Sequence, residues 1–150
     1  MARLMKSLAT AALLLTLNPA IKARQAISTA PATGLFRGTY AELKGRSFKA
    51  GGLVITVMDY QSLMGACTLR LRIGNPGSQP AQVSGEDIAV MGTDQQQFLA
   101  HDNDGHVSAF QARILPGGYV EDFFMFRGSS SVKLPARLYF QGQLLAEFSK

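Results

Sequence analysis

The stretch Cys67–Pro80, CTLRLRIGNPGSQP, decides the fold. Its first half places apolar residues at alternate positions, Cys67, Leu69, Leu71 and Ile73. A period of two is typical of a strand that buries one face and exposes the other. We expect this strand to stop at the Gly-Asn-Pro-Gly cluster 74–77, because proline removes a ladder donor and glycine permits a tight turn.

Other segments with strand character are separated by turn-forming residues at intervals of roughly 8–12 residues. The expected strands are 53–60, 66–73, 87–91, 97–101, 106–115, 119–126, 136–141 and 144–148. The last two are expected to form a hairpin across Gln141-Gly142-Gln143. Many short strands with regular turns predict a β-sandwich or barrel. A chain of 150 residues, 47% of them hydrophobic, has room for one such domain, which we place at 51–150.

The N-terminal residues 1–23 have the organisation of a secretory signal peptide. Basic residues precede a ten-residue apolar run, 8–17, which Asn18-Pro19 ends. Ten helical residues span only about 15 Å, half of the hydrocarbon core of a bilayer, so a spanning helix is not expected. We expect cleavage after Ala23, or after Ala20, and export to the periplasm or the medium. An uncleaved anchor in the membrane interface is the alternative.

The charge of +5 depends on this leader. Three of the 15 basic residues and none of the 10 acidic ones lie in residues 1–23, so the remainder carries +2. No run of lysine or arginine remains to follow a phosphate backbone, and a nucleic-acid partner is therefore not expected. Residues 24–50, rich in small and polar residues at first, are predicted to be a flexible lead. Within them, Thr39–Lys49 is compatible with a helical turn or an edge strand.

The order of several short motifs resembles a known family. The motifs are Asn75-Pro76, Asp87-Ile-Ala-Val90, Gly92-Thr-Asp94, Leu115-Pro-Gly117 and Phe123-Phe-Met-Phe126. Over about 53–148, the chain is similar to the bacterial exported immunoglobulin-like domains of unknown function, a group that includes a small secreted mycobacterial antigen. The resemblance implies an all-β, immunoglobulin-like antiparallel β-sandwich of about seven to eight strands, export, and no catalytic residues. Many members are lipoproteins, but no cysteine lies just after the apolar run here, so a lipid anchor is not expected.

The most polar cluster of the sequence is His101-Asp-Asn-Asp-Gly-His106. Its candidate metal ligands are His101, Asp102, Asp104 and His106, because oxygen ligands at alternating positions suit calcium and imidazoles suit a transition metal. The cluster is only a fragment of a calcium loop, and a plain turn between strands is the alternative that we favour. No other cofactor is predicted.

No catalytic constellation stands at a recognisable spacing, and we expect no enzyme activity. The carboxylate doublets 86–87 and 121–122 each point to opposite faces of a strand, so neither forms a catalytic pair. Ser129-Ser-Ser131 lacks a nucleophile elbow. Cys67, the one cysteine, follows the apolar period of its strand and is expected in the core rather than as a reactive thiol.

The segment Tyr119–Phe126, YVEDFFMF, carries large apolar groups on both faces. One face is therefore expected to be exposed for a partner, and a central strand shielded on both sides is the alternative. The candidate partner-binding residues are Tyr119, Phe124, Phe126, Leu63 and Met64. The sequence thus predicts an exported, non-catalytic module that binds an envelope or secreted protein through a sheet face, an edge strand or loops. A metal- or small-ligand-binding domain using His101–His106 is the alternative.

Overall fold

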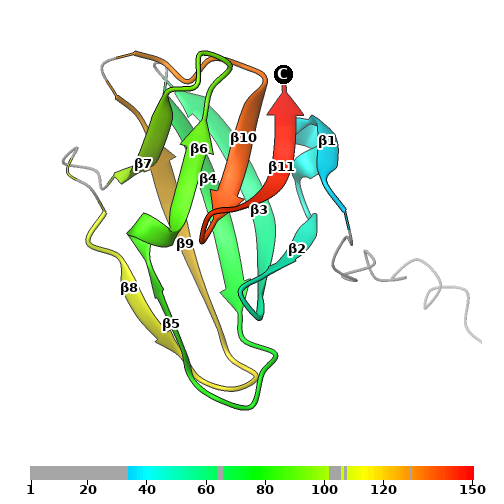
Figure 1. The fold of residues 1–150 in the computed structure, drawn as a ribbon, viewed down its shortest axis with the longest axis vertical. Helices are drawn as coiled ribbons and strands as arrows, with labels where there is room; N and C mark the ends of the chain where they lie inside the picture. The colour runs from blue at the N-terminus through cyan, green and yellow to red at the C-terminus, as the bar shows by residue number, and fades with distance from the viewer. Residues whose placement is uncertain (1–33, 64–65, 102–105, 107, 129) are drawn as a thin grey trace, which may run out of the picture.

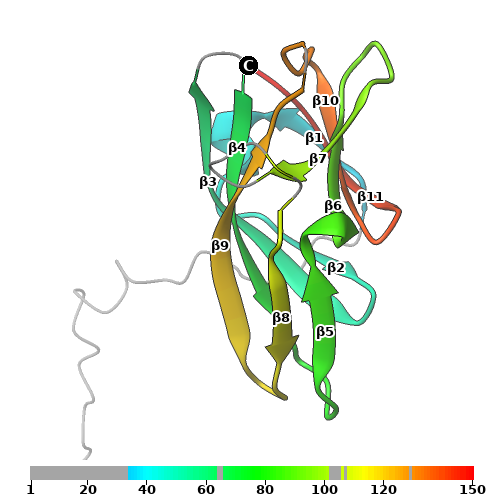
Figure 2. The ribbon, with the colours of Figure 1, turned by 90° about the vertical axis from the view of Figure 1, so that its left-hand side faces the viewer.

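One long sheet turns back on itself to form the two layers of an immunoglobulin-like β-sandwich (Figures 1 and 2). The computed structural model describes residues 34–63, 66–101, 106, 108–128 and 130–150. Its strands are β1 Phe36–Thr39, β2 Ser47–Ala50, β3 Leu53–Leu63, β4 Ala66–Gly74, β5 Ala81–Ser84, β6 Ile88–Met91, β7 Gln97–His101, β8 Gln111–Ile114, β9 Tyr119–Phe126, β10 Ala136–Phe140 and β11 Gln143–Ser149. A short helix, α2 Tyr40–Leu43, and a 3-10 turn, η1 Gly85–Asp87, complete the described elements.

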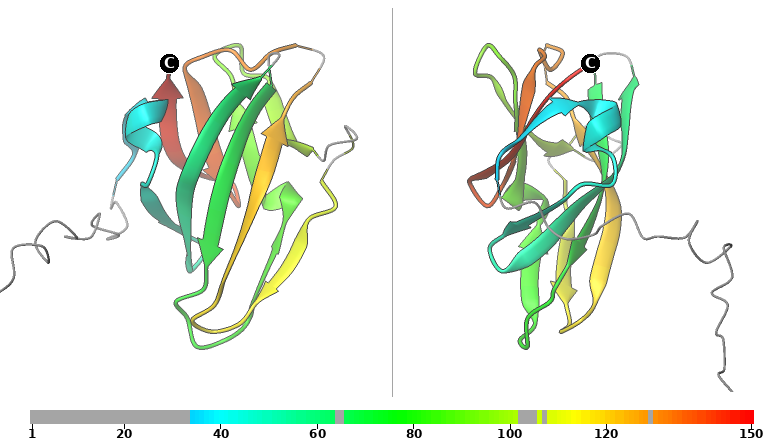
Figure 3. Two further views of the ribbon diagram at one scale, coloured as in Figure 1. Left: turned by 180° about the vertical axis from the view of Figure 1, so that it is seen from behind. Right: turned by 90° about the vertical axis from the view of Figure 1, so that its right-hand side faces the viewer.

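The large sheet has the strand order β1-β11-β10-β6-β7-β9-β4-β3-β2, and β5 pairs with β8 separately. Strand β7 pairs with β6 on one side and with the end of β9 on the other, so it links the two layers. Strands β3, β4 and β9 lie side by side in one layer, as Figure 3 shows from behind. All pairs are antiparallel except β1 with β11.

The alternation of β4 builds the centre of the core, as its sequence predicts. Cys67, Leu69, Leu71 and Ile73 are all at most 3% exposed. The polar residues between them face outward, and Arg70 is exposed. Phenylalanines of β9, β10 and β11 are buried in the same cluster, namely Phe124, Phe126, Phe140 and Phe148. Removing this apolar surface from water is the main favourable term in folding.

Strand β4 ends at Gly74, where the turn signal begins, and Asn75 is buried there. The Asn75 amide nitrogen donates to the carbonyls of Gln79 and Ile114, at 2.7 and 3.0 Å. Its side-chain oxygen accepts from the Gly77 N–H at 3.0 Å. One side chain therefore joins the β4–β5 turn to the end of β8.

The strands predicted at 97–101 and 119–126 are confirmed, and the predicted hairpin forms between β10 and β11. Gln141 and Gly142 have positive φ angles of 48° and 76°, as a tight hairpin turn requires. The strand predicted at 106–115 is shorter, since only Gln111–Ile114 pair with β5.

The sandwich begins earlier than predicted. Within the segment expected to be a flexible lead, β1 pairs with β11 and β2 pairs with β3. The Phe36 ring of β1 contacts the Phe48 ring of β2, with centroids 6.4 Å apart, so the two ends of the sheet meet. Both alternatives considered for Thr39–Lys49 occur, a helical turn followed by an edge strand. Residues 1–33, with the predicted leader, lie outside the described residues.

Candidate binding surface on strands β4 and β9

The outer face of β9 carries two exposed aromatic side chains. Tyr119 is 61% exposed and Phe123 is 55% exposed. Alternation along a strand puts both on one face, about 13 Å apart, with Glu121 between them. The register with β4 places Glu121 opposite Arg72 and Phe123 opposite Arg70. Aromatic, acidic and basic side chains are therefore neighbours on one face of the sheet.

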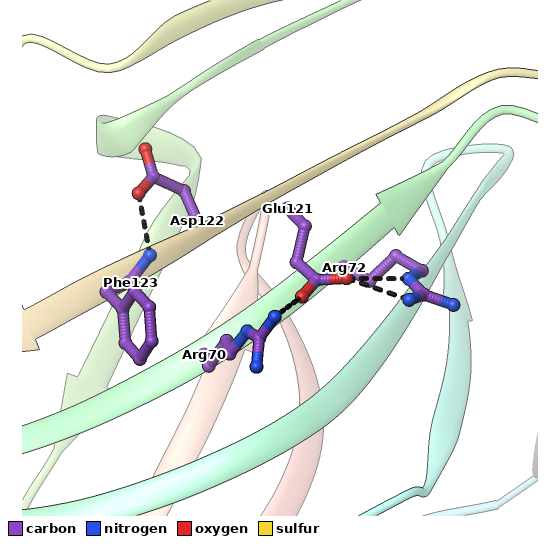
Figure 4. Close-up of polar contacts among 5 residues, drawn as sticks. All are labelled: Arg70, Arg72, Glu121, Asp122 and Phe123. Carbon is purple, nitrogen blue, oxygen red and sulfur yellow. Dashed lines mark hydrogen bonds and ion pairs between the residues drawn. The ribbon is translucent and has the colours of Figure 1, made fainter.

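Glu121 holds both arginines (Figure 4). The Nε and Nη2 atoms of Arg72 each lie 2.9 Å from the Glu121 Oε2 atom, and Arg70 Nη2 pairs with Oε1. The hydrogen bond from Arg72, together with the positive charges of both guanidinium groups, lowers the pKa of Glu121. The carboxylate therefore stays charged to a lower pH than an isolated glutamate does.

Each arginine also lies over one of the two aromatic rings. The guanidinium carbon of Arg72 is 4.7 Å from the centre of the Tyr119 ring, and that of Arg70 is 5.5 Å from the centre of the Phe123 ring. Cation–π contacts of this kind are worth about 0.5–1 kcal/mol at exposed sites. The five side chains form one ordered array, which we call the arginine–aromatic array, made of Arg70, Arg72, Tyr119, Glu121 and Phe123.

The chemistry of this array suits recognition. Tyrosine and arginine are enriched at the energetic centres of protein interfaces. Side chains that are already ordered lose less conformational entropy when a partner binds. The array can therefore present apolar area and hydrogen-bond donors at little entropic cost.

Of the predicted partner-binding residues, Tyr119 lies on this surface, but Phe124 and Phe126 were wrongly assigned. They are 1% and 0% exposed. Their register pairs Phe124 with Leu69 and Phe126 with Cys67, both core residues of β4, so these rings point into the sandwich. Leu63 ends β3, but its side chain lies outside the described part of the chain.

Met64 also lies outside the described residues. The sequence reasoning missed Phe123, Glu121 and the two arginines. The sequence did contain a signal for this cluster. Arg70 and Arg72 occupy outward positions of β4, and Glu121 is an acidic residue of β9, so a cross-strand pair of opposite charges could have been predicted.

The predicted metal ligands are only partly described. His101 ends β7, is half-buried, and its Nδ1 atom lies 2.8 Å from the Leu99 carbonyl oxygen. His106 is exposed, and Asp102 and Asp104 lie outside the described residues. Among the described residues, no three His, Cys, Asp or Glu side chains gather as metal ligands. The metal site therefore stays a prediction, which calorimetry with calcium, zinc and copper can test.

Cys67 lies in the core, as predicted. Burial raises the pKa of its thiol to about 12. A thiol is a nucleophile only as the thiolate, so Cys67 is protonated and unreactive at neutral pH.

Strand β9 has an edge of its own beside the array. Strand β7 pairs with β9 only at Phe126 and Met125, so residues 119–124 pair with β4 alone among the described strands. The Asp122 carboxylate accepts the N–H of Phe123 at 2.8 Å on the side of β9 away from β4 (Figure 4). A cavity of about 370 Å³, lined in part by His101 and Phe123, adjoins this edge.

No protein-family model matches the chain, and no curated protein sequence matches it significantly. Two solved structures are similar in fold. The YjhA protein of Bacillus subtilis aligns with a TM-score of 0.53 at 11% identity, over 71% of this chain and 80% of its own. The secreted protein MPT63 of Mycobacterium tuberculosis aligns with a TM-score of 0.50 at 10% identity, over 79% of this chain and 100% of its own.

These likenesses confirm the immunoglobulin-like β-sandwich and the predicted resemblance at the level of the fold. In the part of the chain that the structure describes, no helix has the length and apolar character needed to cross a bilayer.

Proposed function

We propose that this protein is an exported, non-catalytic binding module that engages another secreted or envelope protein through the arginine–aromatic array. The observation that carries the proposal is the exposure of Tyr119 and Phe123 on one sheet face, each under an arginine that Glu121 holds in place. Large exposed apolar side chains ringed by polar groups mark interaction sites.

Further observations support the rest of the proposal. The predicted leader supports export, as does a fold shared with a secreted mycobacterial protein. The raised pKa of the buried Cys67 thiol argues against nucleophilic catalysis at that residue. Phe123 lines the cavity beside β9, but the lining of that cavity does not include Arg70, Arg72, Tyr119 or Glu121. Most of the array therefore lies outside this concave site, which suits a protein partner better than a small molecule.

Site-specific photocrosslinking tests the proposal in the protein's own organism. The full chain would carry a photoreactive phenylalanine analogue in place of Phe123. Gln97, exposed on β7, would carry the same analogue as the control. We expect one protein to be crosslinked from position 123 and not from position 97, and the product to be lost when Tyr119 is also changed to Ser. Identical products from both positions, or none from position 123, would rule out the array as the binding surface.

A further inference from the structure

The array presents positive charge to its surroundings although it contains a carboxylate. The side chains of Arg70 and Arg72 are 45% and 42% exposed, whereas that of Glu121 is only 16% exposed. The anion therefore lies beneath the two cations. The nearby pair of Lys44 and Asp59, 3.1 Å apart, adds no net charge to this face.

The two guanidinium groups keep donors for a ligand. Each guanidinium carries five N–H bonds in one plane. Glu121 accepts from the Nε and Nη2 atoms of Arg72 and from the Nη2 atom of Arg70, and the two guanidinium carbons lie over the Tyr119 and Phe123 rings. N–H groups therefore remain on both side chains, in orientations that Glu121 and the rings already set.

The spacing of these donors matches an extended peptide. Arg70 and Arg72 are two residues apart on β4, about 7 Å, which equals the distance between alternate side chains of any extended strand. Two acidic side chains at positions i and i+2 of a partner segment therefore reach both arginines. An apolar side chain at the next alternate position beyond Arg72 then reaches Tyr119, which lies opposite Gly74, while Phe123 lies beside Arg70.

We infer that the partner presents an extended acidic segment, with carboxylates at alternate positions that bind Arg70 and Arg72 and an apolar residue at the next alternate position that contacts Tyr119. This inference rests on the proposed function and names the chemistry of its partner. Two partly neutralised arginines suit a short acidic peptide. A nucleic acid or an anionic membrane binds to larger clusters of basic residues.

Peptide binding to the full chain tests this inference. The probe is a capped peptide, Leu-Thr-Glu-Thr-Glu-Thr-Leu, and its counterpart has glutamine in place of both glutamates. We expect the acidic peptide to bind at least roughly tenfold more tightly at low salt, since charge-assisted hydrogen bonds are about twice as strong as those between neutral groups. The preference should vanish in the double variant Arg70→Gln, Arg72→Gln.

Arg137→Gln is the matched control, because Arg137 is a half-exposed arginine paired with Glu147 at 3.0 Å on another strand. Thermal unfolding of each variant checks that it is folded.

Equal binding of the two peptides, no binding of either, or an equal loss in the Arg137 variant would overturn the inference. So would equally tight binding of heparin or duplex DNA, which would indicate a general polyanion surface. Crosslinking from position 123 without a preference for the acidic peptide would leave the binding surface standing and remove only the acidic partner.

Discussion

Phe123 and Phe124 are consecutive residues of β9, yet their rings lie on opposite faces of the sheet. Phe123 is 55% exposed and lies under Arg70, whereas Phe124 is 1% exposed and contacts the ring of Phe110 in the core. The same residue type is thus exposed to solvent at one position and part of the core at the next. Alanine variants at these two positions can therefore be compared directly, since each removes the same side chain.

Replacing Phe124 by Ala is expected to reduce the free energy of unfolding by about 3–5 kcal/mol, since it leaves a cavity in the core. Replacing Phe123 by Ala removes one exposed ring and one cation–π contact and is expected to cost less than about 1 kcal/mol. Urea unfolding followed by circular dichroism measures both. Equal losses in the two variants would contradict the assignment of the faces.

The fold was largely predictable because β4 alternates strictly. Its apolar positions face the core and its arginines face water, and the turn after Gly74 stops the strand where proline and glycine occur. The orientation of β9 was not predictable in the same way, because both of its faces carry large apolar residues. Its pairing register with β4 decides which face is buried, and that register is a long-range property.

Strand β1 was not predicted, and β2 was predicted only as one of two alternatives for Thr39–Lys49, for a related reason. Each has four residues, and each gains its order from one neighbour, β11 or β3. Short edge strands have weak local signals, since tertiary packing rather than propensity stabilises them. The arginine–aromatic array was missed because its members come from two strands whose pairing the sequence does not state.

Asn75 is expected to be the most sensitive polar residue of the turn after β4. Changing it to Ala removes three side-chain hydrogen bonds and leaves the buried carbonyl of Ile114 without that donor. The expected loss in the free energy of unfolding is about 2–4 kcal/mol. Gln79→Ala is the control, because Gln79 contributes only its backbone carbonyl to this network. A loss below that of the Gln79 variant in urea unfolding would show that the network does not stabilise the turn.

Tyr40 and Tyr60 predict a loss of stability in alkali. Their rings stack 3.5 Å apart, and the Tyr60 hydroxyl donates to the Tyr40 hydroxyl at 2.5 Å. Burial raises the pKa of both groups above the ordinary value of 10.0, and for Tyr60 the bond to Tyr40 raises it further. A phenol whose pKa is raised by folding stabilises the native state fully below its unfolded pKa, and that contribution is lost as the pH rises above it.

We therefore expect the thermal midpoint to fall steeply above about pH 10, with part of the tyrosinate absorbance at 295 nm appearing only on unfolding. Tyr60→Phe should reduce that delayed part. If Tyr60→Phe leaves unchanged the tyrosinate absorbance that appears only on unfolding, Tyr60 does not have the raised pKa that its contact with Tyr40 indicates.

Asp122 is expected to prevent strand addition at the free edge of β9. Its carboxylate accepts the N–H of Phe123, and N–H groups of alternate residues point to one side, so those of Tyr119 and Glu121 also face this edge. Charged side chains at exposed edges oppose pairing with other chains. Asp122→Ala should therefore self-associate more than wild type in sedimentation velocity, with slower amide exchange at Phe123, and Asp122→Asn, which keeps an acceptor, should lie between them.

Glu147→Ala is the control for Asp122→Ala, because Glu147 is a carboxylate on β11, which is paired on both sides. A neutralised carboxylate away from a free edge gives no new pairing site. The edge role of Asp122 is wrong if its Ala variant associates no more than the Glu147 variant. It is also wrong if association leaves the Phe123 amide exchanging as in wild type, since the contact then lies elsewhere on the surface.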